Sequence, residues 1–289
     1  MADYASVASI SHMGAVRVSD HWQRALDGWE GWLRAGGAPA TTIAQRTYQL
    51  RRFAADHRTL SPWDITLDDL VLWLAAHDSW RPNTRRAYRG ALRAFYDWAV
   101  AVGQLDRSPA AALPRVKPTR GLPRPIAEDV LRAAVAGADD RERLILLLAA
   151  YGGLRRAEIA AVRRQDVHRD AGGGWQLRVH GKGDAYRDVP LTGALAAALL
   201  EQAEGWLFPS PKTPGRHLTP AHVGVLGSRL LPDGWALHTL RHRFATRVRA
   251  GGADIYVIAE LLGHRNIETT RIYARLADTE LRRAVEAAA

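Results

Sequence analysis

A cluster of prolines near the middle of the chain constrains its fold more than any other feature. Proline lacks the backbone N–H and clashes with the preceding helical turn, so no helix can run through such a segment. The 289-residue chain is long enough for two domains, and residues 106–125 are predicted to form an extended linker between them. The prolines of this linker are Pro109, Pro114, Pro118, Pro123 and Pro125.

Helical periodicity dominates the residues before the linker. One apolar stripe has spacings of four, three and four, which is typical of a single helical face. Three further segments predict helices, at 41–57, at 66–78 with Thr66 as its N-cap, and at 79–103. We therefore predict a four-helix domain over residues 19–105, after a flexible N-terminal segment of residues 1–18. The first stripe consists of Trp22, Leu26, Trp29 and Leu33.

The residues after the linker, 126–289, predict a second domain with a different pattern. Helical segments come first, and then Trp175, Leu177 and Val179 alternate with polar residues, as in a β-strand. A GKGD turn and a returning strand complete a hairpin, and helices follow to the end of the chain. The predicted fold class is mainly α with a small antiparallel β-sheet.

The charge balance indicates the class of partner. The chain carries a formal net charge of +10, which favours a polyanionic partner, most commonly nucleic acid.

The chain has no cysteine, which excludes disulfides, cysteine-ligated zinc and thiol catalysis and fits a cytoplasmic protein. We identify no signal peptide and no membrane-spanning segment, and the basic amphipathic helix or lipid anchor typical of membrane binding is not evident.

A basic stretch, LHTLRHRFATRVRAGG, spans residues 237–252. Its His238 and Arg241 are three residues apart and share one helical face. His238 and His242 have the spacing of two helical zinc ligands, but the glutamate and the acidic third ligand that would complete such a site are missing. We therefore expect no metal site. His242 is interpreted as structural, and Arg243, Arg247 and Arg249 as surface or DNA-backbone contacts.

Other chemically suggestive residues lie on both sides of this stretch. Arg155 and Glu158 are again three residues apart on a predicted helix. Lys182 lies between two glycines at the hairpin tip. His264 follows Gly263 at a helix end, and Tyr273 comes nine residues later.

Four motifs in this order resemble the signature boxes of the tyrosine recombinase (phage integrase) family. They are GLRRAEI, VHGKGDAYRDVPL, LHTLRHRFAT and LLGHRNIETTRIYA, and the resemblance covers residues 125–280. It implies a catalytic domain there and a core-binding domain in the four-helix region. It also implies Glu158 as a residue that orients an active-site arginine, and Tyr273 as nucleophile. The implied activating set is Arg155, Lys182, His238, Arg241 and His264.

The chemistry of DNA strand transfer suits these residue types. Two guanidiniums match the non-bridging oxygens of a pentavalent phosphorane. A tyrosine, with an ordinary pKa of about 10, needs help to lose its proton, and histidines titrate in the range to take it. Lys182 can protonate the leaving 5′-oxygen, and the product is a covalent 3′-phosphotyrosine. This chemistry implies no metal and no cofactor. We expect the cleavage rate to fall on the acidic side as a histidine becomes protonated, and a rate that is flat from roughly pH 5 to 9 would count against His238 or His264 as the base.

Arginines on two N-terminal helices are candidates for DNA binding. Four of them recur every four residues on the fourth predicted helix, with no acidic partner until Asp97, so a phosphate backbone is a natural counter-charge. The linker would then act as a strap that lets two domains clamp a duplex. The predicted DNA-binding residues are Arg46, Arg51, Arg52, Arg81, Arg85, Arg89 and Arg93.

The expected function is site-specific recombination of double-stranded DNA in the cytoplasm, most directly phage or mobile-element integration and excision. The short segment before the first helix predicts binding to core-type sites only. A tail helix over 279–287, with Leu281 and Val285, predicts a homotetramer on paired sites, and an accessory directionality factor is a further possible partner. The alternatives are Xer-type chromosome or plasmid dimer resolution, a type IB topoisomerase and a non-catalytic DNA-binding regulator.

Overall fold

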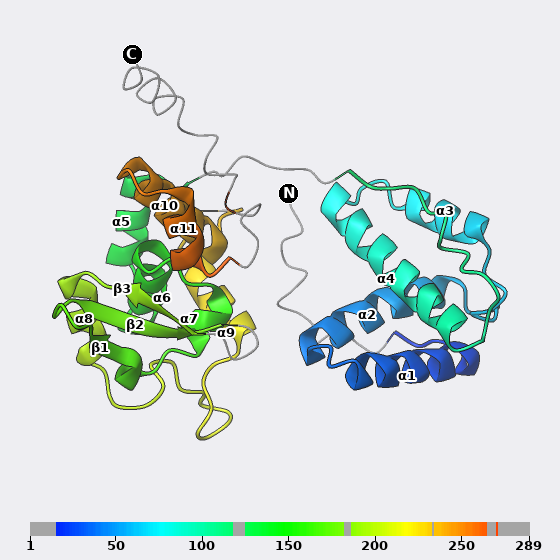
Figure 1. The fold of residues 1–289 in the computed structure, drawn as a ribbon, viewed down its shortest axis with the longest axis horizontal. Coiled ribbons are helices and arrows are strands. Elements are labelled where there is room, and N and C mark those ends of the chain that lie inside the picture. The colour runs from blue at the N-terminus through cyan, green and yellow to red at the C-terminus, as the bar shows by residue number, and fades with distance from the viewer. Residues whose placement is uncertain (1–15, 118–124, 182–185, 233, 265–269, 271–289) are drawn as a thin grey trace, which may run out of the picture. The chain divides into compact units, whose positions relative to one another are not determined.

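The computed structural model describes residues 16–117, 125–181, 186–232, 234–264 and 270. These residues form two compact units, an N-terminal one up to residue 117 and a C-terminal one from residue 125 (Figure 1). The predicted flexible segment, apart from its last residues, and the predicted tail helix lie outside the described residues. Among the described helices, none combines the length and the apolar character needed to cross a membrane.

The N-terminal unit contains the four predicted helices around an aromatic core. Trp22, Leu26 and Trp29 of the first stripe are buried, and the Trp22 ring stacks on Phe95 with ring centroids 5.8 Å apart. Burial of such large rings is the main source of stability in a unit of this size. The helices are α1 (Asp20–Ala35), α2 (Ala40–Asp56), α3 (Leu67–Ala76) and α4 (Pro82–Ala101).

Local sequence sets where these helices begin. The Thr66 hydroxyl accepts a hydrogen bond from the backbone N–H of Asp69, and the Asp69 carboxylate accepts one from the backbone N–H of Thr66 at 2.8 Å. This reciprocal capping box confirms the predicted N-cap of α3. Pro82 occupies the first turn of α4, where its missing N–H removes no helical hydrogen bond, so the helix begins later than the predicted residue 79.

The first part of the predicted linker differs from the expectation of an extended strap. Ala110 and Leu113 are buried in the core of the N-terminal unit. The Arg89 guanidinium holds this segment in place, because its Nε and one terminal nitrogen donate to the Leu113 carbonyl oxygen at 3.2 and 2.7 Å. Residues 106–117 therefore pack as part of the N-terminal unit, and residues 118–124 lie outside the described residues.

The C-terminal unit is mainly helical with one small sheet. Helix α6 is its central element: Ile145, Leu146 and Leu148 are fully buried, and α5, α7, α8, α9 and α10 pack against α6. The helices are α5 (Glu128–Ala136), α6 (Asp140–Tyr151), α7 (Arg156–Ala160), α8 (Gly193–Leu200), α9 (Pro220–Ser228), α10 (Leu237–Ala250) and α11 (Ile255–Leu262), with a 3-10 turn η1 (Arg164–Asp166).

The sheet has three antiparallel strands in the order β1 (Val167–Arg169), β2 (Trp175–His180) and β3 (Tyr186–Pro190). Strands β2 and β3 are the predicted hairpin, whereas the three-residue β1 is too short to show an alternating pattern. Leu177 pairs with Val189, and Val179 pairs with Arg187. Side chains at paired positions lie on the same face of a sheet, so Arg187 shares the inner face with Val179 and Val189.

Candidate active site

The site begins at the turn between α6 and α7. Gly153 has a positive φ of 64°, and a Cβ atom there would lie 2.4 Å from the Phe244 ring. Only glycine meets both conditions. The turn that it permits aims the Gly153 carbonyl oxygen at Arg241, whose guanidinium donates to it at 2.6 Å.

Glu158, on the short helix α7, is the buried centre of the site. Its carboxylate accepts hydrogen bonds from the Arg155 backbone and side chain at 2.8 and 2.7 Å. It accepts two more from Arg187, at 3.0 and 2.8 Å, in a bidentate pair. The Arg241 guanidinium lies 3.6 Å from the same carboxylate. Burial alone would raise the pKa of Glu158, but the hydrogen bonds and charges of Arg187 and Arg155 bring this pKa below its ordinary value.

Three guanidiniums thus share one carboxylate, which leaves an excess of positive charge. The three are not equally accessible: the Arg155 side chain is 42% exposed, whereas those of Arg187 and Arg241 are 12% and 3% exposed. An excess of positive charge next to an exposed guanidinium is suited to binding an anion such as a phosphodiester.

The C-terminal end of α11 brings the last described element of the site into place. The helix ends at Gly263, which adopts the left-handed conformation with φ 60° and ψ 50°. His264 follows directly, and its Nε2 lies 3.1 Å from a terminal nitrogen of Arg241. The Nδ1 atom of His264 lies 2.7 Å from the hydroxyl oxygen of buried Thr270.

These contacts set the protonation state of His264. An arginine can only donate, so Nε2 of His264 must accept, and the ring hydrogen lies on Nδ1, from which it is donated to Thr270. Burial, together with the charges of Arg241, Arg155 and Arg187, lowers the pKa of His264 to about 4, although Glu158 opposes this shift. At neutral pH His264 is therefore uncharged.

His238 and His242 lie on neighbouring turns of α10, with ring centroids 4.2 Å apart. The His238 residue keeps part of its surface exposed, but the packing around its ring and the charges of Arg241 and Arg155 lower its pKa. Burial, His238 and Arg241 lower the pKa of His242 to about 4. His238 is therefore uncharged at neutral pH and able to accept a proton.

The structure thus brings several of the predicted site residues together. Arg155 and Arg241 both lie against Glu158, and His264 contacts Arg241, whereas His238 is near enough for the charges of Arg241 and Arg155 to lower its pKa. Lys182 and Tyr273 lie outside the described residues, so their roles stay predictions.

Arg187 is part of this cluster, but it was not among the predicted site residues. The signal was available, because alternation along β3 places Arg187 on the same face as the inward Val189. A charged residue at an inward strand position requires a buried partner of opposite charge, and here that partner is Glu158.

The predicted surface role of Arg243 is wrong. Its side chain is 4% exposed, because α10 is covered on two faces rather than one. The guanidinium donates to the Ala150 carbonyl oxygen at 3.1 Å and to Glu128 at 2.5 Å, and it lies over the Tyr151 ring. Arg243 therefore ties α10 to α5 and α6, whereas Arg247 is exposed.

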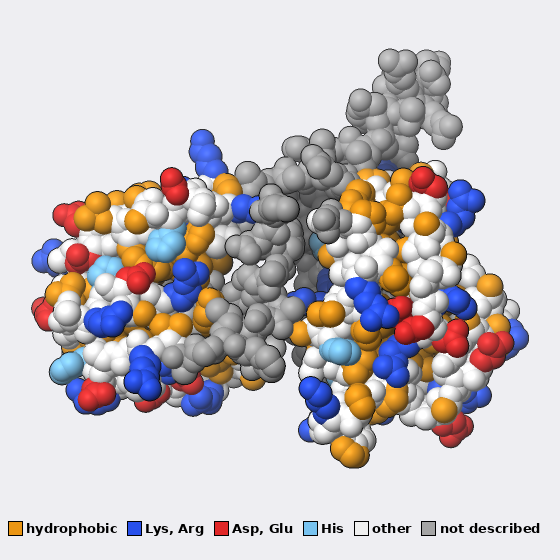
Figure 2. Space-filling model, turned by 180° about the vertical axis from the view of Figure 1, so that it is seen from behind, with side chains coloured by type: hydrophobic (Ala, Val, Ile, Leu, Met, Phe, Trp, Pro, Cys, Tyr) orange, Lys and Arg blue, Asp and Glu red, His pale blue; other side chains and the backbone are white. Residues whose placement is uncertain are grey.

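Several predicted DNA-binding arginines have protein acceptors. Arg85 donates to the carbonyl oxygens of His77 and Asp78, Arg89 to Leu113, Arg51 to Gln23 and Arg52 to the Tyr88 hydroxyl. Arg85 and Arg89 therefore have intramolecular roles that the stripe alone did not indicate. On the face shown in Figure 2, basic and acidic side chains are interspersed over both units.

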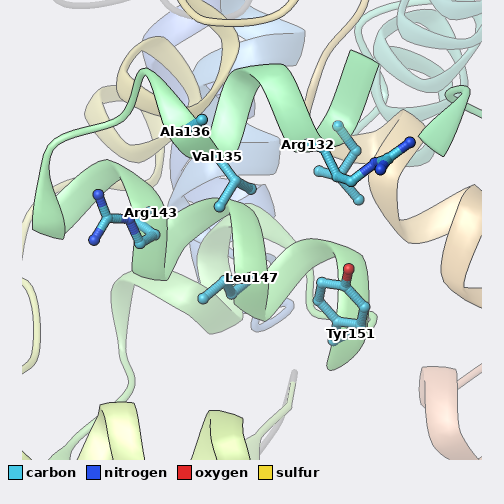
Figure 3. A pocket seen from close by; sticks show the side chains of 7 residues that line it. Arg132, Val135, Ala136, Arg143, Leu147 and Tyr151 are labelled. Atoms are coloured by element: carbon cyan, nitrogen blue, oxygen red, sulfur yellow. The ribbon is translucent and has the colours of Figure 1, made fainter. Parts of the chain in front are cut away.

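A cavity of about 250 Å³ lies between α5 and α6 (Figure 3). Apolar side chains, two arginines and Tyr151 line it, and the residues around Glu158 are not among them. The cavity is therefore a feature separate from the arginine cluster. Within the described ranges, no group of three or more His, Asp or Glu side chains is placed to hold a metal ion.

Comparison with known proteins identifies the class. The model of the phage integrase family matches residues 125–280. The tyrosine recombinase XerC of Rhodospirillum centenum is 34% identical over 86% of this chain and 82% of that protein. XerD of Caulobacter vibrioides is 33% identical over 71% of this chain and 74% of that protein.

Solved structures agree on the fold. The XerH recombinase bound to palindromic difH in a post-cleavage complex has a TM-score of 0.69 at 20% identity, covering 96% of this chain and 92% of that one. A lambda integrase dimer bound to a COC′ core site has a TM-score of 0.66 at 19% identity, covering 85% and 95%. The fold and the relatives together define a site-specific recombinase that uses a tyrosine. The chain belongs to the phage integrase family.

Proposed function

We propose that this recombinase acts in the Xer manner, exchanging strands between two copies of one site and so resolving chromosome or plasmid dimers. The observation that carries this proposal is the similarity, over most of the chain, to relatives named XerC and XerD. These relatives support resolution better than phage or mobile-element integration, the function expected from the sequence alone.

The proposed substrate is double-stranded DNA. The fold is shared with recombinases whose structures contain difH and a COC′ core site. The net charge of +10 and the excess of arginines around Glu158 support the same substrate. We place the protein in the cytoplasm, where it would assemble as a homotetramer on paired core-type sites, with accessory factors directing the outcome.

The described residues support a role in binding and activating the scissile phosphate. Arg155, with its exposed guanidinium, would bind one non-bridging oxygen, and Arg241, held by the Gly153 and Leu262 carbonyl oxygens, would approach another. The charge on these oxygens grows as the phosphorane forms, so fixed guanidiniums stabilise the transition state more than the substrate. Loss of one such donor typically costs about 3 kcal/mol.

The remaining steps use residues whose roles stay proposed. The Tyr273 hydroxyl attacks phosphorus while an uncharged histidine takes its proton. This base is His238, or His264 once its Nε2 exchanges the Arg241 N–H for the tyrosine hydroxyl. The bond from phosphorus to the 5′-oxygen breaks, and Lys182 supplies the proton that this leaving oxygen needs. A 5′-hydroxyl from the second site then attacks the 3′-phosphotyrosine and releases the tyrosine, which conserves the number of phosphodiester bonds.

The test begins with the DNA site. Sheared genomic DNA of the encoding organism is incubated with the protein, and covalent complexes are captured under denaturing conditions and sequenced. The recovered site is then placed on a supercoiled plasmid as two direct repeats. We expect two smaller circles, and crosslinking of the synapse should give tetramers.

Other outcomes would separate the alternatives. Exchange that requires two sites of different sequence would support integration instead. Relaxation without exchange would support a topoisomerase, and the absence of any covalent complex would support a regulator. Crosslinks that yield only monomers would contradict the tetramer.

A further inference from the structure

Three consecutive carbonyl groups at the end of α11 are each bound by a different arginine. The Leu261 oxygen accepts from Nε of Arg187 at 2.9 Å, and the Leu262 oxygen accepts from Arg241 at 2.6 Å. The Gly263 oxygen accepts from Arg155 at 3.3 Å. The last carbonyls of a helix lack helical partners and lie at the negative end of its dipole, so cations are favoured there.

The same three arginines converge on Glu158. The cluster therefore joins two ends that are far apart in sequence, the start of α7 and the end of α11. His264 is the residue that follows this held turn, and its Nε2 contacts Arg241. Whatever fixes the end of α11 relative to Glu158 also fixes His264 relative to Arg155 and Arg241.

Arg187 has the most restrictive geometry of the three. It reaches from the inner face of β3, uses both terminal nitrogens on Glu158 and uses Nε on the Leu261 carbonyl. It also packs under Gly263, where an added Cβ atom would lie 2.8 Å from its terminal nitrogen. The β2–β3 hairpin that carries Arg187 is the one that leads to Lys182.

We propose that Arg187 is a positioning residue for strand cleavage, which locks the hairpin, Glu158 and the end of α11 together so that Arg155, Arg241 and His264 keep one mutual geometry. The proposal rests on the roles of those three residues under the proposed function. Arg187 itself is nearly buried and does not need to touch DNA.

Replacing Arg187 by lysine separates the effect of its geometry from the effect of its charge. It keeps the positive charge beside Glu158 and His264, but a single ammonium group on a flexible stem cannot reproduce a planar fork and an additional Nε–H donor. If geometry matters, Arg187→Lys should cleave as slowly as Arg187→Gln. If only charge matters, Arg187→Lys should behave like the wild type.

The matched control is Arg178→Gln. Arg178 pairs with Asp188 through two hydrogen bonds of 3.1 Å on the same hairpin, but its side chain is 52% exposed and forms no part of the cluster around Glu158. Its loss removes a bidentate ion pair from the same hairpin without touching the end of α11.

Two readouts test the proposal in the full-length protein. The first is single-turnover formation of the covalent complex on a nicked duplex that contains the captured site, with DNA affinity measured separately. We expect Arg187→Lys and Arg187→Gln to lose about 10- to 100-fold in rate at saturating DNA with little change in affinity, and Arg178→Gln to keep the wild-type rate. A wild-type rate in Arg187→Lys, or an equal loss in Arg178→Gln, would overturn the proposal.

The second readout is independent of DNA. NMR of histidine-labelled protein follows the pKa of His264, which faces Arg155, Arg187, Arg241 and Glu158. Arg187→Gln removes one cation, so the pKa of His264 should rise. Arg187→Lys keeps the cation, so this pKa should stay low, but the chemical shifts of the His264 ring should change with the altered geometry. Unchanged His264 signals in both variants would overturn the proposal. If the wild type forms no covalent complex, the proposed function fails, while this readout still decides whether Arg187 fixes the position of His264.

Discussion

Replacing Glu158 by glutamine tests whether the buried carboxylate holds the arginine cluster together. If the amide oxygen keeps the place of Oε2, it can still accept from the Arg155 backbone. The amide nitrogen then takes the place of Oε1 and faces the Arg155 and Arg187 guanidiniums, which now donate to Oε1 at 2.7 and 3.0 Å, so donor meets donor. Arg187 and Arg241 are then left nearly buried without an adequate counter-charge.

The magnitude follows from burial. Removing one partner of a buried ion pair typically costs about 3–5 kcal/mol, and Arg155 contributes little to this because its side chain is 42% exposed. We therefore expect Glu158→Gln to lower the free energy of unfolding of the C-terminal unit by about 3 kcal/mol. The pKa of His264 should also fall further, because Glu158 is the neighbour that raises it.

The assay is urea denaturation at pH 7 followed by circular dichroism and tryptophan fluorescence. Asp188→Asn is the control, since the Arg178–Asp188 pair is exposed and should contribute only about 0–1 kcal/mol. A loss in Glu158→Gln no larger than in Asp188→Asn would refute the view that Glu158 organises the site.

Three further predictions concern the stability of the C-terminal unit. Because His264 and His242 have pKa values of about 4 in the folded protein and near 6.5 when unfolded, the unfolded chain binds more protons between these values. The free energy of unfolding should therefore fall as the pH drops from 6.5 to 4, by about 1–2 kcal/mol per histidine after allowing for partial exposure. Between pH 7 and 8 it should not change. Thermal denaturation measured across this pH range tests both expectations. Arg243→Met should lower the free energy of unfolding by about 1–3 kcal/mol, because the Ala150 carbonyl oxygen loses its donor, and urea titration against Arg247→Met provides the exposed control. Gly153→Ala should lower the free energy of unfolding by more than about 2 kcal/mol, because it combines a positive φ with a clash against Phe244. Gly173→Ala, also at positive φ but with open space around it, should lower this free energy by less. Equal losses in the two variants would show that the Phe244 contact is unimportant.

The depressed pKa of His264 also changes the expected pH dependence of cleavage. From ordinary histidine values, the fall was expected within roughly pH 5 to 9. With a pKa of about 4 in the free protein, His264 stays uncharged to lower pH, so its contribution to kcat/KM should be lost only near pH 4. A bound phosphate adds a negative charge beside His264, so the fall measured at saturating DNA should lie at higher pH than the fall measured at low DNA concentration.

Much of the site was predictable because helical spacing is local. Arg155 with Glu158, and His238 with Arg241, are pairs three residues apart, so their shared faces follow from the sequence. The hairpin was also predictable, since Leu177 and Val179 alternate with polar residues. The capping box at Thr66 belongs to the same class of short-range signal.

The remaining features depend on contacts between distant segments. The binding of Leu261, Leu262 and Gly263 by three arginines requires the end of α11 to meet α7, and no local pattern encodes that meeting. Arg243 lies two residues from Arg241 and so points to the opposite face of the helix. That face is solvated in an ordinary surface helix but covered in α10, so the predicted surface position of Arg243 was wrong. Ala110 and Leu113 lie among prolines without periodicity, so their burial left no signature in the sequence.

The most direct test of the central claim is the chemical identity of the covalent complex. The protein is incubated with a nicked duplex that contains the captured site, digested with protease and nuclease, and analysed by mass spectrometry. We predict a nucleotide attached through a 3′-phosphate to Tyr273, and no complex from Tyr273→Phe at equal DNA binding. A nucleotide attached to any other residue, or a complex that survives Tyr273→Phe, would contradict the account.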